Sequence, residues 1–184
     1  MKIGITGSLS SGKSTVAKML SKNKNILFSA DEAVRKLYSN KVFKKKVRKK
    51  FNLKGENLKK EIKIKLLKKE ISFKTLGKLI HPRVRIRMKK FYNTNKNKKI
   101  LFFEIPLLIE SKLINFFDYI ILVIAPKKIR LKRYIKNGGE KEMFKILDKN
   151  QIPAQKKIQF CDFLIVNNKS LKILKQRVNG IINQ

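Results

Sequence analysis

The apolar positions of the chain fall into five short runs that are separated by longer segments of helical periodicity. The runs occupy residues 2–5, 25–28, 100–105, 119–124 and 162–166. Because each run is short and bounded by turn residues, with helical segments in between, the pattern predicts buried strands of one parallel sheet. We therefore expect a three-layer α/β fold with a five-stranded parallel sheet and a last helix over residues 170–182.

The pattern is helical throughout residues 41–95, where glycine and proline nearly vanish. Apolar residues recur at four-residue spacing in two series there, Phe43, Val47, Phe51 and Leu58, Ile62, Leu66. Residues 52–57 predict the turn between two helices. The segment is too long for a plain crossover, so we interpret it as a helical insertion that binds an acceptor substrate, within a single domain of residues 1–184.

Further along the insertion, His81-Pro82 predicts the end of one helix and the start of another, because proline suits a first helical position. His81 is the only histidine, and a lone histidine before proline is more often a cap or a structural residue than a catalyst. Arg83, Arg85 and Arg87 follow at alternate positions, which do not share a helix face. At most one or two of these arginines can therefore reach one ligand.

Residues 127–150 combine a basic helix, a glycine pair and a second helix. Arg130 and Arg133 are three residues apart and so lie on one face, and Gly138-Gly139 can act as a hinge. The segment predicts a lid in which an arginine neutralises charge on a transferring phosphoryl group while closure excludes water. A solvent-exposed basic face would show the same pattern.

Length and composition fit a soluble protein with a substantial core. The chain has 184 residues, 42% of them hydrophobic, and no apolar run reaches the roughly 20 residues that span a bilayer. Its apolar start is a strand and not a signal peptide. Cys161 is the only cysteine, which excludes an internal disulfide and disfavours a zinc site. We expect a cytoplasmic protein without a membrane partner.

The formal net charge is +35. Such a charge can indicate a polyanionic partner, but it also arises when solvent-exposed positions drift to lysine. The basic residues are spread along almost the whole chain, and asparagine and isoleucine are abundant too. We therefore favour drift and expect no specific nucleic-acid partner.

The turn after the first strand carries the first chemical motif. Gly7, Gly12, Lys13 and Ser14 satisfy G-x-x-x-x-G-K-[ST], the phosphate-binding loop. Glycines let the loop turn backbone N–H groups inward, and the start of the next helix adds N–H groups and a positive dipole end. A Gly/Ser turn can match by accident, but the flanking strand and helix disfavour this. The sequence thus predicts a P-loop NTPase core of the kind found in nucleoside monophosphate kinases.

Four residues receive individual roles in this prediction. Lys13 supplies an ammonium group for the β- and γ-phosphates, and Ser14 a hydroxyl for Mg²⁺. Glu104 ends the third expected strand, where ligands of parallel sheets bind, and can contact Mg²⁺. Asp31 follows the second strand; it can accept the proton of an attacking hydroxyl, hold Mg²⁺ through water, or merely cap the next helix. Spacing alone leaves these interpretations of Asp31 open.

With these motifs in place, the chain resembles the dephospho-CoA kinase family. Residues 3–7 and 12–15 are similar to its opening G-I-T-G-G-I-G-S-G-K-S-T. Residues 76–85 and 105–110 match its more specific stretches L-G-x-L-I-H-P-x-V-R and I-P-L-L-F-E. Single matches follow the order of the chain at Ala30, Asp31, Gln151, Lys157, Asp162 and Asn167.

The resemblance implies ATP- and Mg²⁺-dependent phosphorylation of the ribose 3′-hydroxyl of dephospho-CoA, the last step of coenzyme A synthesis. It places ATP on Gly7, Ser10, Ser11, Gly12, Lys13, Ser14, Thr15 and Asn167, with Mg²⁺ bound through ATP at Ser14. It places the acceptor on Asp31, His81, Arg85, Pro106 and Leu107. The catalytic residues it implies are Asp31, Lys13 and Arg133.

Some positions depart from the family pattern. Ser8 and Ser10 replace loop glycines, and serine adopts unusual backbone angles at a higher cost. Ser29 replaces the first aspartate of D-A-D, and Lys136 stands where arginine is common. These changes predict slower catalysis or looser binding. A nucleoside or nucleotide monophosphate kinase is the main alternative function, and a P-loop nucleic-acid-binding protein is a weaker one.

Overall fold

The computed structural model describes residues 1–22 and 26–182, so Asn25, the first residue of the second expected strand, lies outside the described residues. The chain divides into two compact units. The first, here the sheet unit, comprises Met1–Ser29 and Tyr92–Gln184, and the second, here the helical unit, comprises Ala30–Phe91. The helical unit begins before the insertion expected over residues 41–95, because α2 (Ala30–Ser39) packs against α3 (Lys41–Phe51).

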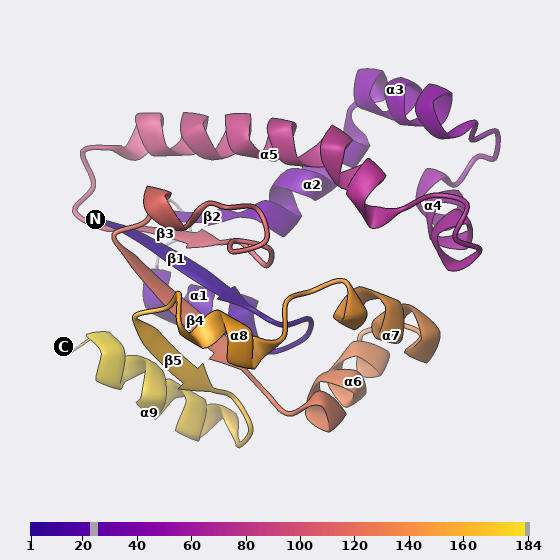
Figure 1. The fold of residues 1–184 in the computed structure, drawn as a ribbon. Helices are drawn as coiled ribbons and strands as arrows, with labels where there is room; N and C mark the ends of the chain where they lie inside the picture. The colour runs from indigo at the N-terminus through magenta and orange to yellow at the C-terminus, as the bar shows by residue number, and fades with distance from the viewer. Residues whose placement is uncertain (23–25, 183–184) are drawn as a thin grey trace. The chain divides into compact units, whose positions relative to one another are not determined.

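Five parallel strands form the sheet, in the order β2-β3-β1-β4-β5 (Figure 1). They are β1 (Lys2–Gly7), β2 (Leu27–Ser29), β3 (Leu101–Glu104), β4 (Tyr119–Ile124) and β5 (Phe163–Val166). Each strand agrees with an expected apolar run within two residues, which confirms the predicted parallel sheet. In register, Glu104 pairs with Ile5 on one side and with Ser29 on the other, so the carboxyl ends of β1, β2 and β3 share one edge.

Helices cover both faces of the sheet, which confirms the three-layer prediction. On one face, α1 (Lys13–Ser21) and α9 (Leu171–Ile182) pack around a core that includes Ile5 and Ile121. On the other face, α8 (Ala154–Ile158) lies in front of β4 (Figure 1). The connection after β3 covers β1 so closely that a Cβ atom on Gly4 would lie 2.6 Å from Leu108 Cδ1.

The segment predicted as a lid is a helical hairpin of α6 (Lys127–Lys136) and α7 (Lys141–Lys149). The rings of Tyr134 and Phe144 pack across it, with centroids 5.6 Å apart. Its turn requires the glycine pair, because Gly138 has φ +80° and a Cβ atom on Gly139 would lie 2.2 Å from the Tyr134 ring. Closure of this hairpin over a ligand stays a prediction.

The helical unit has a hydrophobic core of its own. It is built by α2, α3, α4 (Leu58–Leu67) and most of α5 (Phe73–Asn95). The buried core residues are Leu37, Phe43, Val47, Phe51, Leu53, Leu58, Ile62, Leu66 and Leu76. Both four-residue series read from the sequence are therefore buried, as their spacing predicts. Among the described residues, α5 included, no helix is both long and apolar enough to cross a bilayer.

The predicted helix break at His81-Pro82 is wrong, because α5 continues through Pro82 without interruption. Proline has no N–H to donate to the carbonyl four residues earlier, so an interior proline costs a helix about 3 kcal/mol. Local contacts support this turn: Arg83 Nη1 donates to Leu79 O at 2.8 Å, and the Arg83 guanidinium lies 5.2 Å from the Phe43 ring centroid. Packing of the helical core thus outweighs the local preference for a break.

Candidate active site

The two motif glycines of the phosphate loop occupy positions that no other residue fits. Gly7 has φ +151° and Gly12 has φ +97°. A Cβ atom on Gly7 would lie 2.1 Å from the Val123 carbonyl oxygen, and one on Gly12 would lie 2.1 Å from Asn167 Nδ2. The loop is therefore packed against β4 on one side and against Asn167 on the other.

The two serines that replace loop glycines differ in backbone conformation. Ser10 has φ +57°, in the left-handed region, where a residue with a Cβ atom is disfavoured by at least about 1 kcal/mol. Ser8 is not among the described residues with positive φ. The higher conformational cost predicted for both serines therefore applies to Ser10, and for Ser8 the prediction is wrong.

Lys13, Ser14 and Glu104 meet at the carboxyl end of the sheet. Lys13 is buried and its Nζ donates to the Ser8 carbonyl at 2.8 Å, inside the loop. Ser14 Oγ donates to Glu104 Oε1 at 2.5 Å, and Glu104 is only 4% exposed. Hydroxyl and carboxylate oxygens are the hard ligands that suit Mg²⁺, and such sites draw their other ligands from phosphates and water. No group of three or more His, Cys, Asp or Glu residues within the described ranges could hold a metal ion.

Two side chains from far along the sequence hold the peptide groups of Leu9. The Leu9 N–H donates to Gln151 Oε1 at 2.9 Å. The Leu9 carbonyl accepts from Arg130 Nη1 at 3.3 Å. Gln151 follows α7 and Arg130 lies on α6, so both ends of the helical hairpin contact the phosphate loop.

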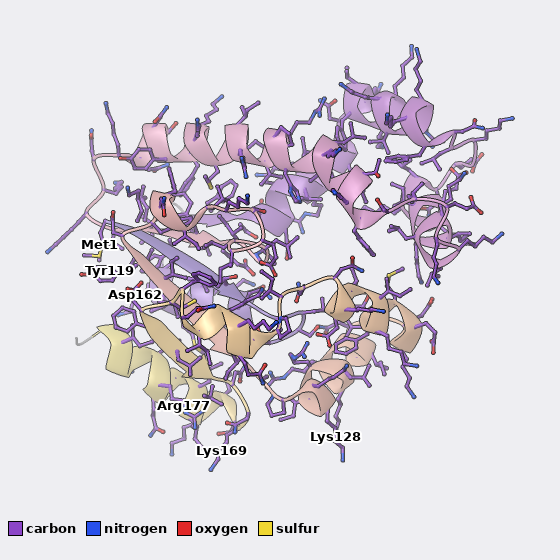
Figure 2. All side chains as sticks on the ribbon, viewed as in Figure 1. Met1, Tyr119, Lys128, Asp162, Lys169 and Arg177 are labelled. Carbon is purple, nitrogen blue, oxygen red and sulfur yellow. The ribbon has the colours of Figure 1, made fainter. Side chains whose placement is uncertain are left out.

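The Ser11 carbonyl is held in a similar way. It accepts from Asn167 Nδ2 at 2.8 Å and from Arg133 Nη1 at 3.4 Å. Arg133 Nη2 also donates to Asn167 Oδ1 at 3.2 Å, so the three groups form a closed triangle. Arg177 of α9, labelled in Figure 2, supports the neighbourhood of Asn167 by donating to the Val166 carbonyl and to Asn168 Oδ1.

Arg130 is buried at the base of the hairpin. Its Nη1 donates to Asp148 Oδ1 at 2.6 Å, its Nε donates to the Ala125 carbonyl at 3.1 Å, and its guanidinium lies 5.6 Å from the Phe144 ring centroid. Burial would raise the pKa of the Asp148 carboxyl, but the hydrogen bonds and charges of Arg130 and Lys127 lower it further than burial raises it. Asp148 is therefore ionised at neutral pH and fixes Arg130 beside Leu9.

Comparison with known proteins identifies the family of this site. The sequence profile of the family described as dephospho-CoA kinase matches residues 1–172. The chain belongs to the dephospho-CoA kinase family. A dephospho-CoA kinase from Bartonella quintana is 36% identical over 186 residues, covering 98% of this chain and 95% of that protein.

Solved structures agree with this family assignment. The protein TT1252 from Thermus thermophilus has a TM-score of 0.78 at 26% identity. The dephospho-CoA kinase from Campylobacter jejuni has a TM-score of 0.68, also at 26% identity. In both cases the comparison covers 100% of this chain and 96% of the other. The resemblance to the dephospho-CoA kinase family that the sequence motifs indicate is confirmed.

Asp31, the residue that aligns with the D-A-D motif of the dephospho-CoA kinase family, lies in the first turn of α2 and is exposed. The helix begins at Ala30, directly after β2, so Asp31 is inside the helix and does not precede it as a cap. The interpretation of Asp31 as the N-cap is therefore wrong. An acidic side chain in a first turn is still favoured by the helix dipole.

The other predicted acceptor residues are divided between the two units. His81 and Arg85 are four residues apart on α5, in the helical unit, and a Cβ atom on Gly77 would lie 3.2 Å from the imidazole. Burial and the neighbouring charge of Arg85 both lower the pKa of His81, so its imidazole is neutral at pH 7. Pro106 and Leu107 follow β3 in the sheet unit, where the Pro106 carbonyl accepts from Thr6 Oγ1 at 3.1 Å.

The structure brings the predicted ATP residues together in the sheet unit, with Thr15 in the first full turn of α1. It adds two residues that were not predicted as site residues, Arg130 and Gln151. Both had a signal in the sequence, since Arg130 lies one turn before Arg133, and Gln151 matches the family spacing. What the sequence did not provide is their common contact, the peptide groups of Leu9.

Proposed function

We propose that the protein transfers the γ-phosphoryl group of ATP to the ribose 3′-hydroxyl of dephospho-CoA, yielding coenzyme A and ADP. Membership of the dephospho-CoA kinase family over residues 1–172 supports the reaction and the acceptor. The observation that carries the proposal is the phosphate loop in which Lys13, Ser14 and Glu104 converge. A kinase needs this combination of a cation for the phosphates and oxygen ligands for a metal ion.

On the ATP side, each group has a role that follows from its chemistry. Lys13 neutralises charge on the β- and γ-phosphates when its ammonium group exchanges the Ser8 carbonyl for phosphate oxygens. Ser14 and Glu104 are the residues that would hold Mg²⁺, which offsets charge on the phosphates when bound. Arg133, whose Nη1 donates to the Ser11 carbonyl of the loop at 3.4 Å, is the cation we assign to the transferring phosphoryl group.

On the acceptor side, we assign Asp31 as the base that receives the proton of the 3′-hydroxyl, or orients that hydroxyl for in-line attack. Its position supports the assignment, because Asp31 is two residues beyond Ser29, whose strand neighbour is Glu104. His81 and Arg85 of the helical unit, with Pro106 and Leu107 of the sheet unit, are proposed to bind the acceptor. The neutral imidazole of His81 can donate one hydrogen bond and accept another, which suits a polar uncharged group.

We also propose that the protein acts in the cytoplasm and has no specific nucleic-acid partner. Burial, followed by the charge of Asp162, raises the pKa of the Cys161 thiol to about 11, which keeps it protonated and unreactive. Nitrogen-tipped side chains extend from helices of both units (Figure 2), so the basic residues are not confined to one segment of the chain. A net charge of +35 still attracts anionic substrates of any kind.

A panel of acceptors tests the proposal. The full chain is incubated with ATP and Mg²⁺ and with either dephospho-CoA, nucleosides, nucleoside monophosphates or RNA, and ADP release is followed. We expect ADP formation above the acceptor-free rate with dephospho-CoA alone. Turnover of a nucleotide without turnover of dephospho-CoA would contradict the assigned acceptor, and RNA-stimulated ATP hydrolysis would contradict the assigned class.

A further inference from the structure

Two hydrogen bonds fix the backbone of the phosphate loop at Leu9, and in both the partner side chain comes from outside the loop. Gln151 Oε1 accepts from the Leu9 N–H at 2.9 Å, and Arg130 Nη1 donates to the Leu9 carbonyl at 3.3 Å. We infer that Gln151 and Arg130 are positioning residues that keep residues 9–10 in the conformation that binds ATP. This inference rests on the proposed ATP-dependent function.

The loop needs such support because of Ser10. Its φ of +57° is a conformation that glycine adopts freely and serine does not. The peptide group before Ser10 is held by Arg130 at the Leu9 carbonyl. The peptide group after Ser10 is held by the hydrogen bond from Ser11 N to the Ser8 carbonyl, at 3.1 Å. Contacts on both sides therefore prevent Ser10 from rotating to a negative φ, which would turn these peptide groups away from the phosphate site.

Gln151 is itself held firmly enough to act in this way. Its backbone N–H donates to the Asp148 carbonyl at 3.2 Å, and the next residue, Ile152, donates to Glu110 Oε1 at 3.1 Å. The same carboxylate oxygen lies 2.7 Å from Nζ of Lys157, which is fully buried. The ion pair of Glu110 with Lys157 of α8 thus anchors the segment from which Gln151 reaches Leu9.

Arg130 is anchored independently, by Asp148, the Ala125 carbonyl and the Phe144 ring. Asp148 is the point where the two supports meet, since its side chain binds Arg130 and its carbonyl binds the Gln151 N–H. The phosphate loop and the helical hairpin are therefore joined at Leu9 as one unit. The strain of a serine in a glycine position is balanced by contacts from residues more than a hundred positions away.

A double-mutant cycle tests this inference by direct ATP binding, measured by calorimetry on the full chain without any acceptor. Gln151→Ala is expected to weaken ATP binding by about tenfold, the effect of losing one hydrogen bond. In the Ser10→Gly background the same substitution is expected to weaken it by no more than about threefold, because glycine holds the left-handed conformation without support. Gln155→Ala, at an exposed position on α8, is the matched control and should leave ATP binding unchanged.

Equal losses in both backgrounds, or unchanged ATP binding in Gln151→Ala, would overturn the inference. Thermal unfolding of each variant separates this effect from loss of fold, and Gln151→Asn, which keeps the amide but is one methylene shorter, should behave like Gln151→Ala. In turnover assays the KM for ATP should rise while the KM for dephospho-CoA stays constant. If dephospho-CoA is not phosphorylated at all, the proposed function fails, but the calorimetric result for Gln151 still decides the positioning role.

Discussion

The sheet unit and the helical unit hold their functional residues in different ways. In the sheet unit, polar side chains that are distant in sequence fix single peptide groups, as Gln151 does for Leu9 and Asn167 for Ser11. In the helical unit, the core is a set of apolar residues at helical spacing. The side chains of Asn40 and Asn57 cap its helices by accepting from backbone N–H groups only three residues further on. The proposed donor site thus depends on backbone geometry fixed by distant side chains, whereas the proposed acceptor residues Asp31, His81 and Arg85 stand on helices that pack through apolar residues at helical spacing.

The largest expected effect comes from the donor site. Lys13→Met keeps the length of the side chain but removes the charge proposed to neutralise the phosphates, and it should lower kcat by about 10³-fold. Lys18→Met, at an exposed position on the same helix, is the control and should keep wild-type turnover. Comparable rates for Lys13→Met and Lys18→Met would show that the donor site is not at this loop.

The next effect tests the acceptor side. Asp31→Asn should lower kcat by about 10²-fold or more, because the amide cannot take the hydroxyl proton, while ATP binding measured by calorimetry is unchanged. The control is Glu32→Gln, which alters the neighbouring carboxylate that lies 3.1 Å from Lys36. Unchanged turnover in Asp31→Asn would remove the role assigned to this residue and leave the helical unit without a catalytic group.

A third prediction concerns stability and compares one substitution at two positions of α3. Val47 is fully buried and Val42 is 78% exposed. Val47→Ala should lower the free energy of unfolding by about 2 kcal/mol, from lost transfer energy and a cavity, and Val42→Ala by less than about 0.5 kcal/mol. Denaturant titration of the full chain measures both. Equal effects would contradict the assignment of a separate core to the helical unit.

The smallest expected effects are those of pH on stability, and they should arise at a different pH in each of the two units. Because the native pKa of His81 is lowered, its contribution to stability is present above the unfolded pKa of about 6.5 and is lost as pH falls below it. Asp148 also has a lowered native pKa, so its contribution is lost only as pH falls below about 4.

Melting temperatures between pH 8 and pH 3 test this order. His81→Gln should reduce the fall in melting temperature that begins near pH 6.5. Asp148→Asn should reduce the fall in melting temperature below about pH 4. If the melting temperature of His81→Gln still falls between about pH 6.5 and pH 5 as it does in the wild type, the role assigned to His81 is contradicted. If the melting temperature of Asp148→Asn still falls below about pH 4 as in the wild type, the role assigned to Asp148 is contradicted.

Features set by local chemistry could be predicted from the sequence. The strands follow from short apolar runs, the phosphate loop from Gly7, Gly12 and Lys13, and the helical core from residues spaced by four. The left-handed conformation of Ser10 also agrees with the expectation for a serine in a glycine position, although the same expectation was wrong for Ser8. Each of these inferences needs only a few neighbouring residues.

Features that depend on tertiary packing could not be predicted. Proline favours a helix break at position 82, but Arg83 and the core of the helical unit keep α5 continuous. Nothing local relates Gln151 or Arg130 to Leu9, since their contact arises only after the sheet places the hairpin beside the loop. The interpretation of Asp31 as a cap failed for a similar reason, because α2 already begins at Ala30 and spacing does not specify where a helix begins.

The central claim is that ATP and dephospho-CoA are the two substrates of one transfer to a defined hydroxyl. The most direct test is to incubate the protein with both and Mg²⁺ and to locate the new phosphate by NMR of the product. We predict equal amounts of ADP and product, with the phosphate on the ribose 3′-hydroxyl. ADP without a phosphorylated acceptor, or a phosphate on any other hydroxyl, would contradict the claim.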